Sequence, residues 1–194
     1  MNISAIILAA GQSKRMGQPK MLLPWGNTTV LGKVIETVQA AGIEDILVVT
    51  GGAKGEVEKI IANYKIRVVH NENFEKGEML GSIQLGLIRQ KSSSEAVLIC
   101  LGDQPQVEVG TVQTVVESFH ANKSSIVVPS YQMRRGHPWL IAKELWEEVL
   151  QLQAPKSMRD FLNSHKNEIL YIEHDTPSIL QDLDTPADYL KYKP

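Results

Sequence analysis

The chain has 194 residues, with 20 Lys or Arg and 22 Asp or Glu, so its formal net charge is -2. This length is typical of one domain with a full hydrophobic core, and the near-neutral charge argues against a general nucleic-acid binder. A single cysteine, Cys100, excludes an internal disulfide framework and a multi-cysteine metal site. No apolar run approaches the ~20 residues that a membrane-spanning helix needs. The apolar run from Ile3 to Ala10 does not resemble a signal peptide, because no Lys or Arg precedes it. We therefore expect a cytoplasmic protein that does not bind membranes.

Short apolar runs alternate with stretches of helical spacing along most of the chain. Buried strands are predicted for residues 3–9, 45–50, 66–70, 95–101 and 125–129. Their continuous Val, Ile and Leu content is typical of strands buried on both faces in a mainly parallel sheet. Helical stripes of apolar residues lie within 30–38, 57–64, 80–87, 109–119 and 145–150. The alternation predicts a three-layer α/β domain. Beyond Tyr131 five prolines make it less regular, and we expect a lid or an antiparallel excursion there.

The loop after the first strand combines glycine with positive charge. Gly11 and Gly17 bracket it, and glycine lets backbone amides approach an anion closely. Lys14, Arg15 and Lys20 are uncompensated, because no acidic residue occurs in the first 35 positions. The glycine spacing fits neither the P-loop nor the dinucleotide fingerprint. An exposed basic loop is the simple alternative, but ligands bind α/β sheets at the carboxyl ends of strands, which favours an anion site.

Residues 8–20 read Leu-Ala-Ala-Gly-Gln-Ser-Lys-Arg-Met-Gly-Gln-Pro-Lys. This segment resembles the signature of the MobA-like nucleotidyltransferases, which include the molybdenum cofactor cytidylyltransferases and guanylyltransferases. The resemblance implies a three-layer, Rossmann-like α/β nucleotidyltransferase fold with a mainly parallel central sheet. It implies one domain over 1–194, in which 1–130 bind the nucleotide and 131–194 supply the acceptor side and a C-terminal segment. The nucleotide-binding residues that it implies are Leu8, Ala9, Ala10, Gly11, Ser13, Gly17, Ser82 and Gly102.

Carboxylates follow the fourth predicted strand and recur near the C-terminus. Asp103 lies in Gly-Asp-Gln-Pro, where it could bind a hard cation or merely cap a turn. By resemblance this is the family's metal site, and the catalytic set is Arg15, Lys20 and Asp103 with Mg²⁺ as cofactor. Asp182 and Asp184 precede Thr-Pro, so the segment could simply begin a helix. The family places a similar Asp-x-Asp-Thr-Pro against the metal, so we expect Asp182 or Asp184 to complete the site.

Two further segments resemble family motifs less closely. In residues 73–87, Gly77, Ser82 and Gly86 match a stretch beside the nucleotide base, although Glu78 stands where Met is common. Ser82 is therefore a candidate base or ribose contact, and otherwise an ordinary helix serine.

His137, in Arg-Gly-His-Pro, and Arg159 match segments on the acceptor side. We place His137 near the acceptor without assigning it proton transfer. Glycines expected before Arg159 are absent, which leaves the identity of the acceptor open.

The reaction implied is attack of an acceptor phosphate on the α-phosphate of a nucleoside triphosphate, with release of pyrophosphate. Leu-Ala-Ala-Gly resembles the cytidylyl branch, so CTP is favoured over GTP, with molybdopterin or another phosphorylated small molecule as acceptor. One alternative is a sugar- or polyol-phosphate cytidylyltransferase. Another is a non-catalytic accessory protein that holds the molybdenum cofactor for a client molybdoenzyme. Lys20 and Asp103 favour an enzyme, because triphosphate chemistry uses both a cation and a metal ligand.

Overall fold

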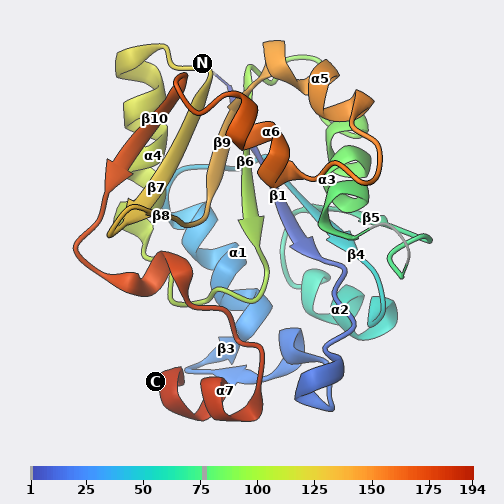
Figure 1. Ribbon diagram of the computed structural model, residues 1–194. Helices are drawn as coiled ribbons and strands as arrows, with labels where there is room; N and C mark the ends of the chain where they lie inside the picture. Colours follow the sequence, from blue (N-terminus) through green and yellow to red (C-terminus); the bar gives the residue numbers. More distant parts are fainter. Residues whose placement is uncertain (1, 76–77) are drawn as a thin grey trace.

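A computed structural model describes residues 2–75 and 78–194 (Figure 1). Its main sheet contains, in spatial order, β10 (Ile169–Glu173), β7 (Ile126–Tyr131), β9 (Trp139–Ala142), β6 (Ala96–Leu101), β1 (Ile3–Ala9), β4 (Ile46–Thr50) and β5 (Arg67–His70), with β8 (Arg134–Arg135) beside β7. Strand β1 is central because every one of its residues is buried. It pairs in parallel with β4 and β6, whose carboxyl ends therefore reach the same edge of the sheet (Figure 1).

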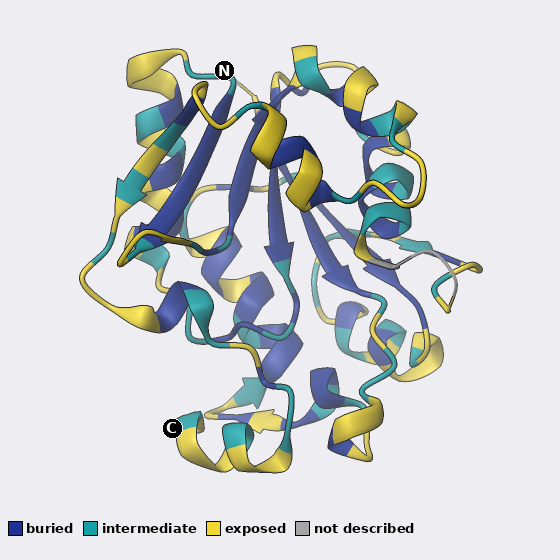
Figure 2. Cartoon of the chain, viewed as in Figure 1, coloured by how far each residue is buried: buried dark blue, intermediate teal, exposed yellow. Residues whose placement is uncertain are grey.

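Helices cover both faces of this sheet, which confirms the predicted three-layer α/β architecture. One face packs against α1 (Val30–Ala40), α2 (Lys54–Ile61) and α4 (Val109–Asn122), and the other against α3 (Glu78–Ile88), α5 (Trp146–Gln151) and α6 (Met158–Ser164). The inner strands β1, β4, β6, β7 and β9 are buried almost throughout, whereas the edge strands β5 and β10 and the outer faces of the helices are partly exposed (Figure 2). No helix in residues 2–75 and 78–194 is long and apolar enough to cross a bilayer.

The region beyond Tyr131 contains the expected antiparallel excursion. Strand β9 runs antiparallel to both β6 and β7, so it separates two sets of parallel strands. Strand β10 returns parallel to β7 at the edge of the sheet. The sequence did not predict β9, β10 or α6, because each is short and lies between prolines or polar segments. The five strands that the sequence predicted are confirmed, with ends shifted by one or two residues.

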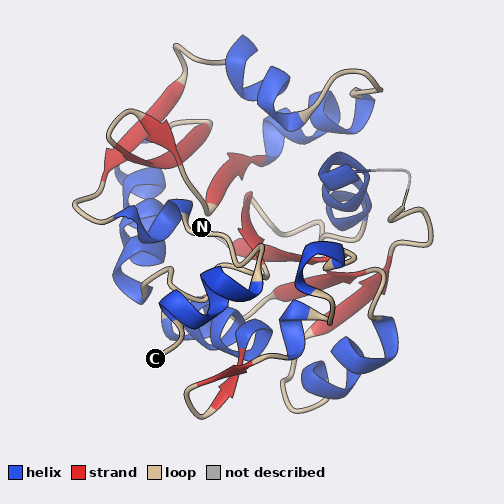
Figure 3. Ribbon diagram, turned by 60° about the horizontal axis from the view of Figure 1, so that its bottom comes forward, coloured by secondary structure: helices blue, strands red, loops and turns tan. Residues whose placement is uncertain are grey.

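A small hairpin early in the chain packs against the C-terminal helix below the carboxyl edge of the sheet (Figure 1). The hairpin β2 (Pro24–Trp25) and β3 (Thr28–Thr29) lies beside the C-terminal helix α7 (Pro186–Tyr192) (Figures 1 and 3). The Tyr189 hydroxyl donates to the Pro24 carbonyl at 2.7 Å, and the ring of Tyr189 packs against that of Trp25. Helix α7 begins with a Thr185 capping box, so the predicted helix start at Thr185 and Pro186 is confirmed. This packing holds residues 182–184 close to the glycine loop.

Candidate active site

The basic loop after β1 is folded back on itself. Ser13 and Gly17 both have positive φ angles, of 51° and 71°, and they flank the short 3₁₀ helix Lys14–Met16. The Ser13 hydroxyl accepts a hydrogen bond from the backbone N–H of Lys20 at 3.1 Å. Met16 is buried beneath the loop. Ser13 and Gly17 therefore shape the loop that brings Lys20 back to the end of β1.

Lys20 joins the loop to two carboxylates from distant parts of the chain. Its ammonium group is hydrogen-bonded to Asp103, which follows β6, and lies 3.3 Å from Asp184. Arg15 pairs with the same Asp184 at 3.0 Å. Burial lowers the pKa of Lys20, but the two carboxylates outweigh that effect and hold the pKa above its usual value. Lys20 is thus a buried, protonated group, whereas Arg15 is exposed to solvent.

A third carboxylate is attached to this cluster through Gln104. The Gln104 amide donates to Asp182 at 2.8 Å and to the Ile179 carbonyl at 3.4 Å. The backbone N–H of Leu183 donates to the Asp103 carbonyl. Partial burial raises the pKa of Asp182, and repulsion from Asp103 and Asp184 raises it further. The Asp103–Gln104 pair therefore fixes the C-terminal segment against the end of β6, a role for Gln104 that the sequence did not reveal.

These groups line a cavity of about 350 Å³ at the carboxyl edge of the sheet. Its walls are formed by Leu8, Ala10, Gly11, Lys20, Met21, Phe74, Met79, Ser82, Leu101, Asp103, Asp182 and Asp184. The structure thus brings together eight of the residues that the sequence singled out. We refer to it as the nucleotide-side cavity.

Four other residues expected to touch a nucleotide lie outside this lining. The side chain of Ala9 is buried in the core cluster that also contains residues of α1. Gly102 is packed so tightly that an added Cβ would lie 2.9 Å from the Leu8 carbonyl oxygen. Ser13 and Gly17 belong to the loop beyond the cavity wall. These four residues shape the strand ends and the loop, and their contact with a nucleotide stays a prediction.

Gly51 is a site residue that the sequence showed only as the end of a strand. A Cβ atom at this position would lie 2.3 Å from the Ala10 carbonyl oxygen. Only glycine therefore lets the chain after β4 pass under the start of the basic loop. Gly52 continues this contact, with the Phe74 ring 3.3 Å from the place of its Cβ.

Ser82 enters the nucleotide-side cavity from the first turns of α3. It is buried, and its hydroxyl accepts a hydrogen bond from the Asn71 side-chain amide at 3.0 Å. Gly86, one turn later, allows α3 to approach β1, because a Cβ there would lie 2.8 Å from Ile6. Gly77, the first residue matched in this motif, lies outside the described residues.

A second, larger cavity adjoins the first. It measures about 880 Å³ and shares Met79, Leu101 and Asp182 with the nucleotide-side cavity. We call it the acceptor-side cavity, because it contains both residues expected there, His137 and Arg159. It also contains Arg134 and Arg135. Within residues 2–75 and 78–194, neither these two arginines nor Arg159 forms an ion pair with a carboxylate.

One of the three arginines is held in place by neutral groups. Arg135 donates to the Tyr171 hydroxyl at 2.9 Å and to Asn163 at 2.7 Å. Its guanidinium also lies over the Tyr171 ring. These partners carry no negative charge, and the three arginines outnumber the two carboxylates of the same lining, Glu173 and Asp182, so the wall is suited to an anion.

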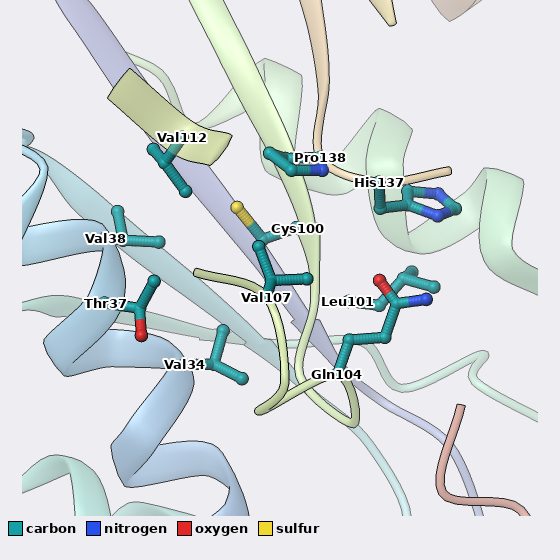
Figure 4. A pocket seen from close by; sticks show the side chains of 10 residues that line it. All are labelled: Val34, Thr37, Val38, Cys100, Leu101, Gln104, Val107, Val112, His137 and Pro138. Atoms are coloured by element: carbon teal, nitrogen blue, oxygen red, sulfur yellow. The ribbon is translucent and has the colours of Figure 1, made fainter. Parts of the chain in front are cut away.

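His137 has an apolar setting beside this cavity. Its ring stacks on Trp139 with 4.1 Å between centroids, and burial lowers its pKa to about 3. Its Nε2 atom is buried without a partner among the described residues. Behind it, a space of only about 10 Å³ separates the ring from Cys100 and the apolar residues of α1 (Figure 4). The imidazole is therefore neutral at neutral pH, and the burial that raises the pKa of Cys100 to about 12 keeps that thiol protonated.

The donor set of the nucleotide-side cavity fits a hard divalent cation. Asp103, Asp182 and Asp184 supply carboxylate oxygens, the ligands that Mg²⁺ and Mn²⁺ accept. Burial is the main cause of the raised pKa of Asp182, and the neighbouring carboxylates of Asp103 and Asp184 add to it, so a nearby positive charge would relieve part of this effect. Lys20 supplies that charge in this structure, and no cluster of three metal-ligating side chains is closed around a common point within the described residues. A metal with one or two protein ligands and phosphate oxygens suits this arrangement.

The model of the MobA-like NTP transferase domain matches residues 5–169, so the chain belongs to that family and is a nucleotidyltransferase of it. It is similar to the molybdenum cofactor cytidylyltransferase of Escherichia coli (strain K12), with 29% identity over 98% of this chain and 95% of that protein. Nicotine blue oxidoreductase from Paenarthrobacter nicotinovorans is also 29% identical, over 94% of this chain and 92% of that protein. Among solved structures, a manganese complex of Rv0371c from Mycobacterium tuberculosis H37Rv has a TM-score of 0.78 and 27% identity, covering 98% of this chain and 97% of that one.

Proposed function

We propose that this enzyme transfers CMP from CTP to the phosphate of molybdopterin or the molybdenum cofactor and releases pyrophosphate. The observation that carries the proposal is the junction of two unlike cavities at Leu101 and Asp182. One combines a buried lysine with carboxylates, and the other presents three arginines without carboxylate partners among the described residues. Two anionic substrates can thus meet at one place, as transfer between them requires.

In the proposed reaction an oxygen of the acceptor phosphate attacks the α-phosphorus of CTP. A new P–O bond forms, the bond from the α-phosphorus to the bridging oxygen breaks, and pyrophosphate leaves with that electron pair. An ionised phosphate is already nucleophilic, so no general base is needed. This agrees with a neutral His137 on the acceptor side. The residues instead position the anions and stabilise the added charge, for which Lys20 and Arg15 are suited.

Mg²⁺ would be held by Asp103, together with Asp182 or Asp184. When bound, it would supply positive charge that stabilises the negative charge developing in the transition state. Lys20 now neutralises Asp103 and Asp184, and a cation that takes over this task leaves the ammonium free for phosphate. Gln104 would keep Asp182 in place meanwhile.

The preference for CTP rests on Ala10, at the start of the basic loop. Ala10 lines the nucleotide-side cavity, and its methyl group reduces the space available to a base compared with glycine. Ser82, Phe74 and Met79 lie on the same wall and are suited to contact a base through one hydroxyl and two apolar surfaces. A small pyrimidine fits this setting better than a purine.

The division of the chain follows from the same arrangement. We propose that residues 1–130 bind mainly the nucleotide and 131–194 mainly the acceptor, with Asp182 and Asp184 returning to the nucleotide side. We further propose that the enzyme acts in the cytoplasm and passes its product to a client molybdoenzyme.

Two measurements on the purified protein test the proposal. In thermal-shift assays with Mg²⁺, CTP at 100 times its Kd should raise the free energy of unfolding by roughly 2.7 kcal/mol. GTP at the same concentration should raise it by less. With CTP and molybdopterin present together, pyrophosphate should be released, and it should not be released when either is left out. Equal or greater stabilisation by GTP contradicts the base assignment.

The acceptor is tested separately from the base. Release of pyrophosphate with a sugar or polyol phosphate, and none with molybdopterin, would favour a sugar- or polyol-phosphate cytidylyltransferase. Binding of CTP with no release on any acceptor would favour an accessory protein that only binds. Either result leaves the family and the fold unchanged.

A further inference from the structure

The side chain of Asn71 is buried between the end of β5 and the start of α3, next to the nucleotide-side cavity. It follows β5 directly, and its backbone N–H donates to the Thr50 carbonyl at 2.9 Å. Asn71 is 6% exposed and Ser82 is 3% exposed. A buried amide in such a place must have its hydrogen bonds satisfied by specific partners.

The hydrogen bonds around Asn71 fix which way its amide points. Its Oδ1 atom accepts from the backbone N–H of Asn73 at 3.0 Å. A backbone N–H can only donate, so the atom that faces it must be the oxygen. The Nδ2 group therefore faces Ser82 and donates to its hydroxyl oxygen at 3.0 Å. The orientation follows from the partners and needs no other information.

This orientation determines the polarity of Ser82. A serine hydroxyl has one proton and accepts through its oxygen. Because Asn71 donates to that oxygen, the hydroxyl proton must point elsewhere, and Ser82 has no second partner among the described residues. Ser82 lines the nucleotide-side cavity. Its free O–H is thus available as a donor to a molecule bound there.

We infer that Asn71 is a positioning residue which makes Ser82 a hydrogen-bond donor to the nucleotide base. The inference rests on the proposed function, since it assigns that cavity to the base of CTP. The matching group on the ligand is an acceptor, such as the O2 or N3 atom of cytosine. The same Asn71 side chain closes the turn that leads to Phe74, so one residue sets both the polar and the aromatic wall.

Asn71→Asp tests this polarity with little change in shape. One aspartate oxygen still accepts from the Asn73 N–H, while the other now accepts from the Ser82 hydroxyl and removes its donor from the cavity. CTP should bind about 10-fold more weakly to Asn71→Asp, and similarly to Ser82→Ala, as loss of one hydrogen bond predicts. Tripolyphosphate, which has no base, should bind both variants as it binds the wild type. The measurement is calorimetric titration of each ligand.

The double variant separates a positioning role from a merely structural one. If Asn71 acts through Ser82, then Asn71→Asp should change CTP affinity less than 2-fold when Ser82 is already Ala. An unchanged 10-fold loss in that background overturns the inference. So does a loss of tripolyphosphate affinity equal to the loss for CTP. Asn71→Ser serves if Asn71→Asp does not fold, because its hydroxyl can still cap the turn but is too short to reach Ser82.

Failure of this inference is distinguishable from failure of the proposed function. If wild type binds CTP without transferring CMP to molybdopterin, the proposed reaction fails while the coupling between Asn71 and Ser82 can still be measured. If transfer occurs but neither variant alters CTP affinity, the reaction stands and the role of Asn71 is wrong.

Discussion

The nucleotide-side and acceptor-side cavities are neighbours, yet they are built in opposite ways. The first is small, and its three carboxylates outnumber its one lysine, which pairs with Asp103 and Asp184. The second is more than twice as large, and the described structure gives its arginines no carboxylate partner. The difference agrees with our proposal that the first cavity binds a metal and a triphosphate, whereas the second binds the anionic acceptor.

The two cavities also depend on different parts of the fold. The nucleotide side uses the ends of buried parallel strands, whose loops are held by Gly51 and by the Ser13–Lys20 hydrogen bond. The acceptor side uses short elements late in the chain, including β8, α6 and β10. Rigid strand ends suit precise placement of a triphosphate, and the more irregular elements suit variation of the acceptor.

Asp103→Asn should give the largest effect, because it removes the carboxylate shared by Lys20 and the proposed metal. The CMP transfer rate should fall by about 100-fold, as expected for loss of a charged contact of about 3 kcal/mol. The Mg²⁺ concentration needed for half-maximal rate should rise. Asp182→Asn and Asp184→Asn should show smaller changes in the same direction. An unaltered Mg²⁺ curve for Asp103→Asn would remove this residue from the metal site.

Lys20→Met should lower the transfer rate by roughly 10- to 100-fold, because a charge-assisted contact to phosphate is lost. Because Lys20 is buried between two carboxylates, this variant should also unfold at a lower temperature. Methionine keeps the packing of the stem. Lys14→Met, in the same loop but exposed and outside the cavity, is the matched control and should behave as wild type. Normal turnover of Lys20→Met would exclude the loop as the triphosphate site.

Arg159→Ala should raise the KM for the acceptor by about 10-fold and leave the KM for CTP unchanged, because one charged contact to the acceptor anion is lost. Arg134→Ala should have a similar effect, since both residues line the acceptor-side cavity. Lys156→Ala, an exposed neighbour that does not line it, is the control. Steady-state rates at varied concentrations of each substrate provide the measurement. A rise in the KM for CTP alone would contradict the assignment of the two cavities.

The last of these predictions concerns stability instead of activity, and specifically the pH dependence of stability. His137 has its pKa lowered to about 3 by burial, so the unfolded chain binds a proton at this residue more readily than the folded one. The contribution of neutral His137 to the free energy of unfolding is fully present above about pH 6.5, and it is lost as the pH falls towards 3. Replacing His137 by Gln should flatten that decline, as measured by urea unfolding between pH 7 and 4. Equal slopes for both proteins would show that His137 is not buried in this way.

The sequence predicted the nucleotide side better than the acceptor side, for physical reasons. Continuous apolar runs identified the buried parallel strands, and charged residues directly after them marked Lys20 and Asp103. Contacts between distant segments could not be predicted, because they depend on how the strands are ordered. The Gln104–Asp182 and Asn71–Ser82 hydrogen bonds are of this kind, as is the close approach of Gly51 to Ala10. Arg134 was missed because its two-residue strand has no periodic pattern.

The division of binding between the two cavities is tested most directly by titrating CTP and molybdopterin separately into Lys20→Met and Arg159→Ala. Calorimetry gives the Kd of each ligand for each variant without requiring turnover. We expect Lys20→Met to bind CTP with Mg²⁺ more weakly than the wild type does and to bind molybdopterin equally well. We expect Arg159→Ala to bind molybdopterin more weakly and CTP equally well. Loss of both ligands by either folded variant, or the opposite assignment of ligands to variants, would contradict it.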